Sequence, residues 1–206
     1  VDPKTGKILA MSSKPDFNPN SYAKTENAAY FNNPAVESVF EMGSIMKPLT
    51  LAGAIDIGAI TPKTRYEDKG YMTLNGKTFN NFDDKARGWV DMQEILNQSL
   101  NTGSAWVALK MGKETFRNYM VSYGFGEKTE IDLPAEVRGK ISNILTSPRD
   151  IEYATAAFGQ GIAVTPVEMA AALSALANGG SLMKPYVVEE IEYDDGLGVK
   201  KITEPV

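Results

Sequence analysis

The chain has 206 residues, of which 43% are hydrophobic and 23% charged, and it carries a formal net charge of −5. This composition is that of an ordinary globular protein with room for a hydrophobic core, and the acidic balance argues against a nucleic-acid-binding surface, which needs a basic stripe. The sequence has no histidine and no cysteine, which excludes Ser-His-Asp and Cys-His catalysis, disulfides and the common zinc sites, so any covalent chemistry depends on Ser, Thr, Lys, Tyr, Asp or Glu.

The first ninety residues carry turn, loop, helix and hairpin signals in that order. "KTGKILAMSS" predicts a turn that leads into a short strand, and the Pro- and Asn-rich residues 14–35 predict an ordered loop. From Ser44 the apolar run "SIMKPLTLAGAIDIGAI" predicts a buried helix that ends near Gly58. Asn75 and Gly76, between "YMTL" and "KTFNNF", predict a β-hairpin.

The middle of the chain is predicted to be helical. Asp91 and Glu94 form a D-x-x-E capping pattern before the apolar "ILNQSL". Gly112 is expected to end the next helix, and Gly124 the one after it.

The last sixty residues predict two more helices and a hairpin. Ser147-Pro148 and Thr165-Pro166 each predict a capped helix start with a proline in the first turn. The stretch that follows predicts a hairpin with its turn at residues 194–196. Helices between strands from the two ends of the chain indicate an α+β fold, a helical lobe beside a sheet.

Ser44 and Lys47 form a candidate nucleophile and base. Their i, i+3 spacing puts both side chains on one face of a helix, where a desolvated lysine of lowered pKa could activate the serine hydroxyl. Pro48 lacks the N–H that would bond to the Ser44 carbonyl, so the helix is expected to begin at about Ser44. The same proline disfavours helical geometry at Lys47.

The S-x-x-K spacing occurs at two further places in the sequence. Residues 21–24 lie in the Asn- and Pro-rich loop, and residues 181–184 follow a Gly-Gly stop. A solvated serine and lysine are the expected outcome at both places. Only the copy at Ser44 combines an apolar setting, a preceding glycine and a helix start.

Ser99-Leu100-Asn101 is the second candidate element, and it lies between two predicted helices. A turn there could point Ser99 and Asn101 into a cleft. The Ser99 hydroxyl could then pass a proton between Lys47 and a leaving group, and the Asn101 amide could hold a substrate carbonyl or fix Lys47. The alternative is that both residues merely cap the next helix.

These motifs, in this order, resemble those of the penicillin-recognising serine enzymes. "GSIMKP" at residues 43–48, followed by "SLN" at residues 99–101, is similar to the transpeptidase domain of class B penicillin-binding proteins. So are the opening "VDPKTGKILAMSSKPDFNPN", the segment with "FGQG" and "TP" at residues 158–180, and "GSLMKPYVVEEI". The resemblance covers nearly the whole chain and implies that family's α+β fold, related to the serine β-lactamases.

The resemblance also implies a function. The family is a group of peptidoglycan D,D-transpeptidases that cross-link stem peptides through a serine acyl-enzyme and are acylated by β-lactams. It implies that Ser44 is the acylated nucleophile, Lys47 its general base, Ser99 a proton relay and Asn101 the residue that binds the substrate amide. No metal and no cofactor are implied.

The resemblance further implies partners and a location. The partners are peptidoglycan stem peptides, β-lactam antibiotics, a glycosyltransferase and proteins of division or elongation, with no nucleic acid among them. The location is the extracytoplasmic side of the bacterial inner membrane. No run approaches the roughly 18 apolar residues of a membrane span, so the anchor is expected in a longer parent protein.

The family's third motif, Lys-Thr-Gly or Lys-Ser-Gly on an inner strand, has no counterpart after Asn101. Lys4-Thr5-Gly6 precedes the nucleophile and fits a turn instead. We therefore expect residues 1–206 to be a partial transpeptidase domain with an incomplete sheet. Such a piece is expected to acylate weakly or not at all, because losing one oxyanion donor typically costs about 100- to 1000-fold in rate.

Two other interpretations stay open. A serine β-lactamase shares the first two motifs, and Glu94 faintly resembles the glutamate that activates the hydrolytic water in one such class, although it precedes Ser99. A short-lived acyl-enzyme would favour the lactamase. The other interpretation is a non-catalytic β-lactam sensor or scaffold domain, which a multi-span signalling segment in the parent protein would favour.

Overall fold

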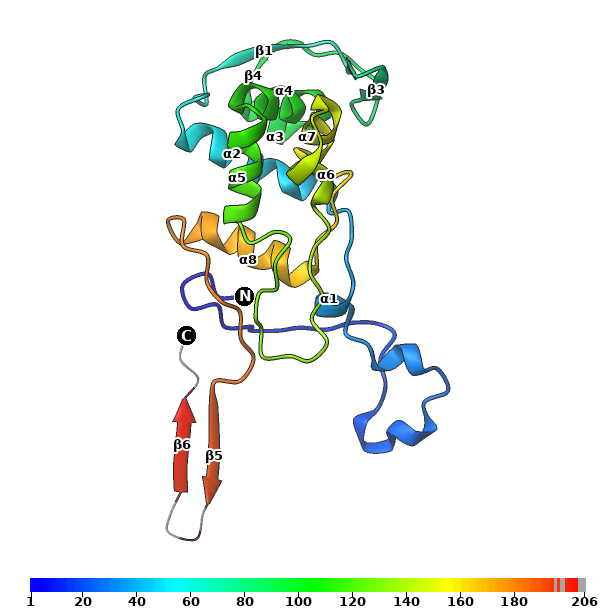
Figure 1. Cartoon of the computed structure of the whole chain (residues 1–206), viewed down its shortest axis with the longest axis vertical. Helices are drawn as coiled ribbons and strands as arrows, with labels where there is room; N and C mark the ends of the chain where they lie inside the picture. The colour runs from blue at the N-terminus through cyan, green and yellow to red at the C-terminus, as the bar shows by residue number, and fades with distance from the viewer. Residues whose placement is uncertain (195, 197–198, 204–206) are drawn as a thin grey trace.

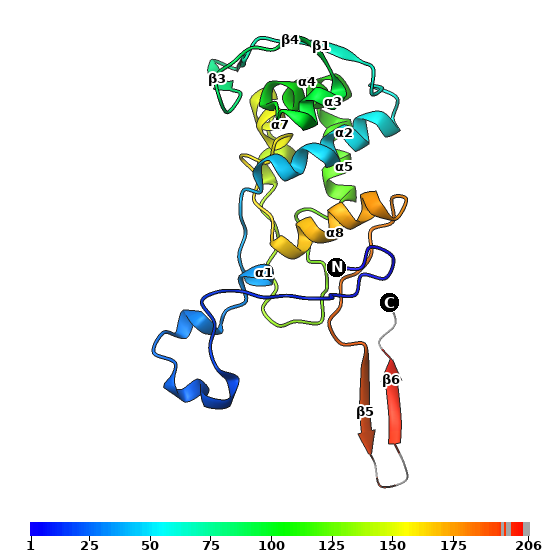
Figure 2. The same ribbon diagram turned by 180° about the vertical axis from the view of Figure 1, so that it is seen from behind.

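The structure is a computed structural model that describes residues 1–194, 196 and 199–203. Helices α2 to α7 and strands β1 to β4 gather at one end of an elongated molecule (Figure 1). Helix α8 crosses beneath this lobe, and the hairpin β5–β6 projects from the far end. The loop that contains the 3-10 helices η1 (Pro19–Lys24) and η2 (Ala28–Phe31) projects to one side. Figure 2 shows the same arrangement from behind.

The α-helices are α1 (Pro34–Glu37), α2 (Lys47–Asp56), α3 (Met92–Asn97), α4 (Asn101–Met111), α5 (Lys113–Ser122), α6 (Ser142–Thr146), α7 (Asp150–Ala156) and α8 (Pro166–Ala177). Short 3-10 helices are η1 (Pro19–Lys24), η2 (Ala28–Phe31) and η3 (Gly43–Met46). The strands pair antiparallel, β1 (Arg65–Asp68) with β4 (Gly88–Asp91), β2 (Tyr71–Leu74) with β3 (Lys77–Asn80), and β5 (Glu190–Asp194) with β6 (Val199–Thr203). This mixture of a helical lobe and short antiparallel sheets confirms the α+β class.

The helix that follows Ser44 begins as expected from Pro48. Because Pro48 has no N–H, the Ser44 carbonyl accepts a bond from the Lys47 N–H instead, and residues Gly43–Met46 form a 3-10 turn before α2. The expectation that Pro48 keeps Lys47 out of helical geometry is wrong, since Lys47 has φ −57° and ψ −42°. Its N–H and its buried side chain are both engaged, and these contacts override the weak local preference.

The β2–β3 hairpin is confirmed, with positive φ at both Asn75 (49°) and Gly76 (76°), as a type I′ turn requires. The strand predicted after the first turn does not form. Among the residues that the structure describes, one parallel bridge, Lys7 to Tyr186, occurs there, and a strand needs a continuous partner. The C-terminal hairpin is confirmed as β5–β6, whereas residue 195 of its predicted turn lies outside the described residues.

The predicted helix caps form at α8 and α3 but not at α7. Thr165 and Glu168 form a complete capping box at the start of α8, with the Thr165 N–H donating to the Glu168 carboxylate at 2.6 Å. At α3 the Asp91 carboxylate accepts the Glu94 N–H at 3.2 Å, as predicted. The cap predicted at Ser147 is wrong, because its hydroxyl accepts the N–H two residues later and α7 begins only at Asp150.

The helix ends agree with the two predicted glycine stops. Gly112, with φ 85°, is the C-cap of α4. Helix α5 has its C-cap at Tyr123, and Gly124 follows with φ 86°. A left-handed glycine just past the last turn is the usual way to end a helix.

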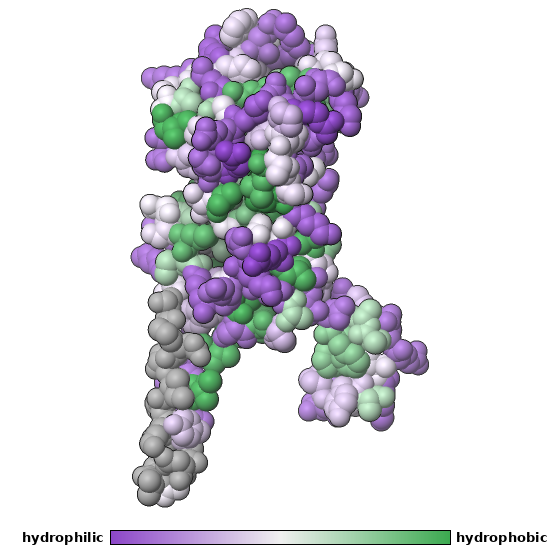
Figure 3. Space-filling model, in the orientation of Figure 1, coloured by the Kyte–Doolittle hydropathy of each residue, from purple (hydrophilic) through white to green (hydrophobic). Residues whose placement is uncertain are grey.

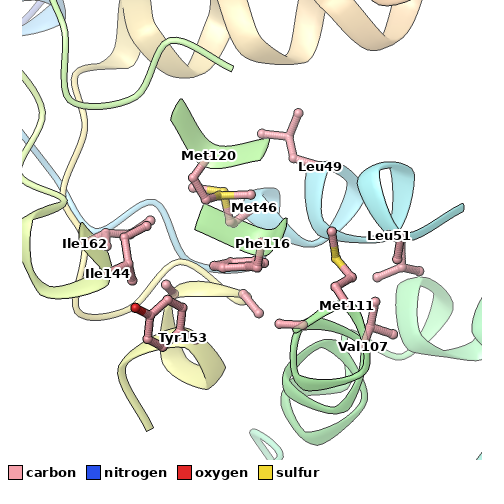
Figure 4. Packing of buried hydrophobic residues seen from close by; sticks show 14 of the residues in the cluster. Met46, Leu49, Leu51, Val107, Met111, Phe116, Met120, Ile144, Tyr153 and Ile162 are labelled. Carbon is pink, nitrogen blue, oxygen red and sulfur yellow. The ribbon is translucent and has the colours of Figure 1, made fainter. Parts of the chain in front are cut away.

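The main hydrophobic core lies between α2, α4, α5 and α7 (Figure 4). Met46, Leu49, Phe116 and Met120 are each fully buried there, and burying a side chain of this size stabilises the fold by about 1.5–3 kcal/mol. Met46 directly precedes Lys47, so the same packing that anchors α2 also fixes the start of the helix.

The face of the molecule in Figure 3 carries hydrophobic surface between the upper lobe and the level of α8. A groove between α2, α5 and α8 is lined by residues that include Ile55, Tyr119 and Leu176.

Among the described residues, no helix is both long enough and apolar enough to cross a bilayer.

Candidate active site

The four candidate residues come together at the start of two helices. Ser44 lies in η3, Lys47 is the first residue of α2, Ser99 lies in the turn between α3 and α4, and Asn101 is the first residue of α4. The Lys47 Nζ lies 2.9 Å from the Ser44 Oγ, 2.9 Å from the Ser99 Oγ and 2.9 Å from the Asn101 Oδ1. The Ser99 Oγ donates to the Ser44 Oγ at 2.9 Å.

Lys47 is buried to an unusual degree for a lysine, with 1% of its surface exposed. Burial disfavours the charged ammonium and lowers the pKa of Lys47 from 10.5 to about 8. Ser44, by contrast, is exposed. The arrangement therefore sets a partly neutral amine beneath a hydroxyl that a substrate can reach.

The hydrogen-bond partners of Lys47 decide which way its lone pair faces. The Ser99 carbonyl, at 2.7 Å, and the Asn101 Oδ1 can only accept, so they take two N–H groups of the lysine. The third N–H of the ammonium faces the two serine hydroxyls. When that proton leaves, the lone pair of the amine faces the Ser44 Oγ, which is the geometry a general base needs.

Asn101 owes the orientation of its amide to a backbone carbonyl. Its Nδ2 donates to the Asn80 carbonyl at the end of β3, at 3.0 Å, so its Oδ1 must face Lys47. This is the contact that the predicted role of Asn101 in fixing Lys47 requires. The alternative in which Ser99 and Asn101 merely cap α4 is wrong, because the N-cap is Leu100 and no side-chain cap bond forms.

Ser99 has a strained backbone conformation. Its φ is 53°, in the left-handed region that serine rarely adopts. This conformation lets one residue present both its carbonyl and its hydroxyl to Lys47. Strain of this kind occurs mainly where the surrounding structure and the function require it.

The turn that carries Ser44 is supported by the "FGQG" segment after α7. The Gly43 N–H donates to the Gly159 carbonyl at 3.1 Å, and the Gly161 N–H donates to the Glu41 carboxylate at 2.9 Å. Neither Gly159 nor Gly161 was predicted to lie at the site. The two glycines in "FGQG" were the sequence signal that could have indicated a close approach of the backbone here. No sequence pattern indicates the contribution of the Asn80 carbonyl.

The other S-x-x-K copies form no such site. Ser21 and Lys24 lie in η1, and Ser181 and Lys184 lie in the segment after α8. Within the described residues, no hydrogen bond joins the serine to the lysine of either pair.

The turn predicted at Lys4-Thr5-Gly6 is confirmed. The Asp2 carboxylate accepts the Lys4 N–H at 3.0 Å and the Thr5 hydroxyl at 2.9 Å. Gly6 has φ 81° and ends the turn.

Glu94 is engaged on its own helix. Its carboxylate accepts bonds from the side chains of Asn97 and Gln98, as expected of a residue in the first turn of α3. Among the described residues, no group of three or more acidic side chains could hold a metal ion. The expectation that the chemistry needs no metal remains a prediction.

A serine one turn from a buried lysine, with a second serine brought in from an interhelical turn, is the arrangement that the resemblance to the penicillin-recognising serine enzymes implies. Residues 1–206 match the family model of the penicillin binding protein transpeptidase domain. The chain therefore belongs to this family, and the resemblance in its motifs is confirmed.

Relatives and solved structures agree with this assignment. The chain is 38% identical over 191 residues to stage V sporulation protein D of Bacillus subtilis, covering 92% of the chain and 29% of that protein. It is 32% identical over 209 residues to the peptidoglycan D,D-transpeptidase MrdA of Acinetobacter baumannii, covering 91% of the chain and 31% of that protein. Penicillin binding protein 3 of Mycobacterium tuberculosis, solved with aztreonam, superposes with a TM-score of 0.89 at 26% identity, over 100% of the chain and 45% of that structure.

The chain spans about three tenths of the length of the curated relatives it matches.

Proposed function

We propose that the protein carrying this domain is a peptidoglycan D,D-transpeptidase that works through a Ser44 acyl-enzyme. The observation that carries the proposal is the set of 2.9 Å contacts among the Ser44 Oγ, the Lys47 Nζ and the Ser99 Oγ. In a chain without histidine or cysteine, this set supplies a nucleophile, a base and a proton path in one place.

The acylation step follows from the contacts. The neutral Lys47 amine takes the Ser44 proton while the Ser44 Oγ attacks the carbonyl carbon of the penultimate D-Ala of a stem peptide. The Lys47 ammonium returns this proton through the Ser99 hydroxyl to the amine of the last D-Ala as the C–N bond breaks. The products are the Ser44 ester and free D-Ala.

Transfer is the same path in reverse. The amine of a neighbouring stem peptide attacks the ester carbonyl, its proton passes through Ser99 to Lys47, and the Ser44 oxygen leaves and takes a proton from Lys47. Asn101 has a role in both steps, because its Nδ2 carries two N–H groups and, within the described part of the chain, only the Asn80 carbonyl accepts a bond from them. The other N–H is available for a carbonyl of the substrate.

The same proposal covers partners and location. Stem peptides are the substrates, β-lactams are the inhibitors that acylate Ser44, and the domain works on the extracytoplasmic side of the bacterial inner membrane beside a glycosyltransferase and proteins of division or elongation. Support comes from the relatives, one of which is a peptidoglycan D,D-transpeptidase and another a sporulation protein.

A fluorescent penicillin tests the proposal in the full-length protein. The expected result is a stable covalent adduct on Ser44, located by mass spectrometry of the labelled peptide, together with release of D-Ala from a stem peptide. Ser44→Ala is expected to abolish labelling, whereas Ser181→Ala, from another S-x-x-K copy, is expected to label normally. Rapid release of hydrolysed penicillin would indicate a lactamase, and labelling without release of D-Ala would indicate a sensor.

The rate of acylation is expected to rise with pH and to level off above about pH 8, where Lys47 loses its proton. At pH 7 a lysine of pKa about 8 is neutral in about a tenth of the molecules, compared with about one in 3000 for an unperturbed lysine. The measurement is the second-order rate constant with a fluorescent penicillin from about pH 6 to about pH 10. A rise in rate centred near pH 10.5 would show that burial does not lower the pKa of Lys47.

A further inference from the structure

Asp68, at the end of β1, is a carboxylate buried to 1% exposure. Its oxygens accept bonds from the Gly70 N–H at 3.0 Å, the Arg87 N–H at 3.0 Å, the Thr102 hydroxyl at 2.7 Å and the Asn81 amide at 3.0 and 3.1 Å. Among the described residues, none of these donors is a cationic side chain. A buried charge of this kind is tolerated only where several donors satisfy it.

Two neighbours complete the network, and both are also buried, with Asn81 and Thr102 each 2% exposed. The Asn81 Oδ1 accepts the Thr102 N–H at 3.2 Å and lies 3.2 Å from the Thr102 hydroxyl. Asp68, Asn81 and Thr102 thus join β1, the segment after β3 and the first turn of α4.

The network surrounds a hydrogen bond that the active site depends on. Asn81 follows Asn80 in the chain, and Thr102 follows Asn101. Asn80 supplies the carbonyl and Asn101 supplies the amide of the bond that turns the Asn101 Oδ1 toward Lys47. The two ends of that bond are therefore each held, one residue away, by the same buried carboxylate.

We propose that Asp68 is a positioning residue, which holds the Asn80 carbonyl against Asn101 and so keeps the Asn101 oxygen on Lys47. This inference rests on the proposed function, because it assigns Asp68 to the same acyl-transfer site. A carboxylate suits the role, since both of its oxygens only accept, and three of these bonds end on Oδ1 and two on Oδ2. An asparagine at position 68 would turn an NH2 group toward some of these donors and leave them unsatisfied.

Without this support the Asn101 amide is free to turn and to present its N–H groups to Lys47. The ammonium would lose an acceptor and face a donor, so the pKa of Lys47 would fall further. The base would then be weaker and less well placed, and a small displacement of a catalytic group can slow a reaction by up to about 100-fold.

Asp68→Asn in the full-length protein tests the proposal, with Thr102→Val as a milder variant that removes one donor without changing volume. Asp83→Asn is the matched control, since Asp83 pairs with the side chain of Arg87 near the same strands and has no bond to α4. The readouts are the rate of acylation by a fluorescent penicillin as a function of pH and the crystal structure of each variant.

Asp68→Asn is expected to slow acylation by up to about 100-fold, and Thr102→Val to slow it less. In both variants, the rise of the acylation rate with pH is expected to occur at lower pH. Asp83→Asn is expected to behave as the unaltered protein. The proposal would be overturned if the variants fold and acylate at the unaltered rate with the unaltered pH dependence. It would also be overturned if their only change is a lower melting temperature. If Asp68→Asn does not fold, Thr102→Val decides by the same criteria.

The structures separate this inference from the proposed function. If penicillin does not acylate the unaltered protein, the proposed function fails, and the position of the Asn101 amide still tests Asp68. Loss of the Asn101–Asn80 hydrogen bond in the variants supports the positioning role. An intact bond in Thr102→Val and Asp68→Asn overturns it.

Discussion

Lys47→Met in the full-length protein is expected to slow acylation of Ser44 by a penicillin about 100- to 10,000-fold. This is the usual contribution of a positioned general base. Methionine matches the unbranched shape of the buried lysine but carries no proton acceptor that could take the Ser44 proton. The Ser99 hydroxyl remains 2.9 Å from the Ser44 Oγ, yet a neutral hydroxyl is too weak a base to replace the amine.

The same variant is expected to keep its fold. The lowered pKa of Lys47, about 8 against 10.5, means that the folded state disfavours the ammonium by about 3 kcal/mol below pH 8. Between about pH 8 and pH 10.5 the unfolded chain binds more protons than the folded protein, so the stability of the unaltered protein rises with pH over that range. Methionine removes this penalty, which offsets the bonds lost at the Ser99 carbonyl and at Asn101.

Rates of labelling and thermal unfolding, measured side by side, check this prediction. Lys184→Met, from the S-x-x-K copy after α8, serves as the control and is expected to change neither. Labelling of Lys47→Met at the unaltered rate would rule out this lysine as the base. A large fall in unfolding temperature would mean that Lys47 stabilises the fold, contrary to the argument from its pKa.

The local part of the site could be predicted from the sequence. The i, i+3 spacing of Ser44 and Lys47 and the missing N–H of Pro48 both act within one turn of helix, and the structure has both consequences. Thr165 and Glu168 form their capping box for the same reason. Interactions between residues three or four positions apart depend on local geometry alone.

The contacts between distant segments could not be predicted in this way. Ser99 meets Lys47 across 52 residues and Asn101 meets it across 54, and no periodicity in the sequence encodes these separations. The family resemblance alone indicated that the two motifs meet. The role of the Asn80 carbonyl is even harder to predict, because every residue has a backbone carbonyl and the residue type does not indicate what it binds.

Two local expectations were wrong because distant contacts decided the outcome. Lys47 is helical despite Pro48, since its side chain is held by Ser99 and Asn101 from other segments. The segment after the first turn is apolar enough for a strand, but strand geometry also needs a partner, and the described residues offer only the bridge to Tyr186. Propensity is a weak guide wherever tertiary contacts favour another conformation.

Gly159→Ala is expected to have the largest effect of any single methyl group added near the site. A Cβ at Gly159 would lie 2.3 Å from the carbonyl oxygen and 2.5 Å from the amide nitrogen of Gly43, far inside contact distance. The clash is with backbone and cannot be relieved by rotating a side chain. Gly159 also has φ 78°, which adds strain for alanine, so the free energy of unfolding should fall by about 2–5 kcal/mol.

The rate of acylation should fall as well, because Gly43 directly precedes Ser44, the proposed nucleophile. Pushing the Gly43 backbone away moves Ser44 relative to Lys47, and such a displacement can cost up to about 100-fold in the rate of acylation. Gly179→Ala is the matched control, since Gly179 has φ 87° but a Cβ there would have no atom within 4 Å. This control carries the strain without the clash, so only a small loss of stability and no loss of acylation are expected.

The comparison separates two explanations for the glycine at position 159. If the two variants lose similar stability and both acylate normally, only the left-handed conformation requires the glycine. If Gly159→Ala loses acylation at temperatures where it remains folded, the close approach of Gly159 to Gly43 fixes the position of Ser44. The 3.1 Å hydrogen bond between the Gly43 N–H and the Gly159 carbonyl favours the second outcome, because that bond requires the two backbones to stay this close.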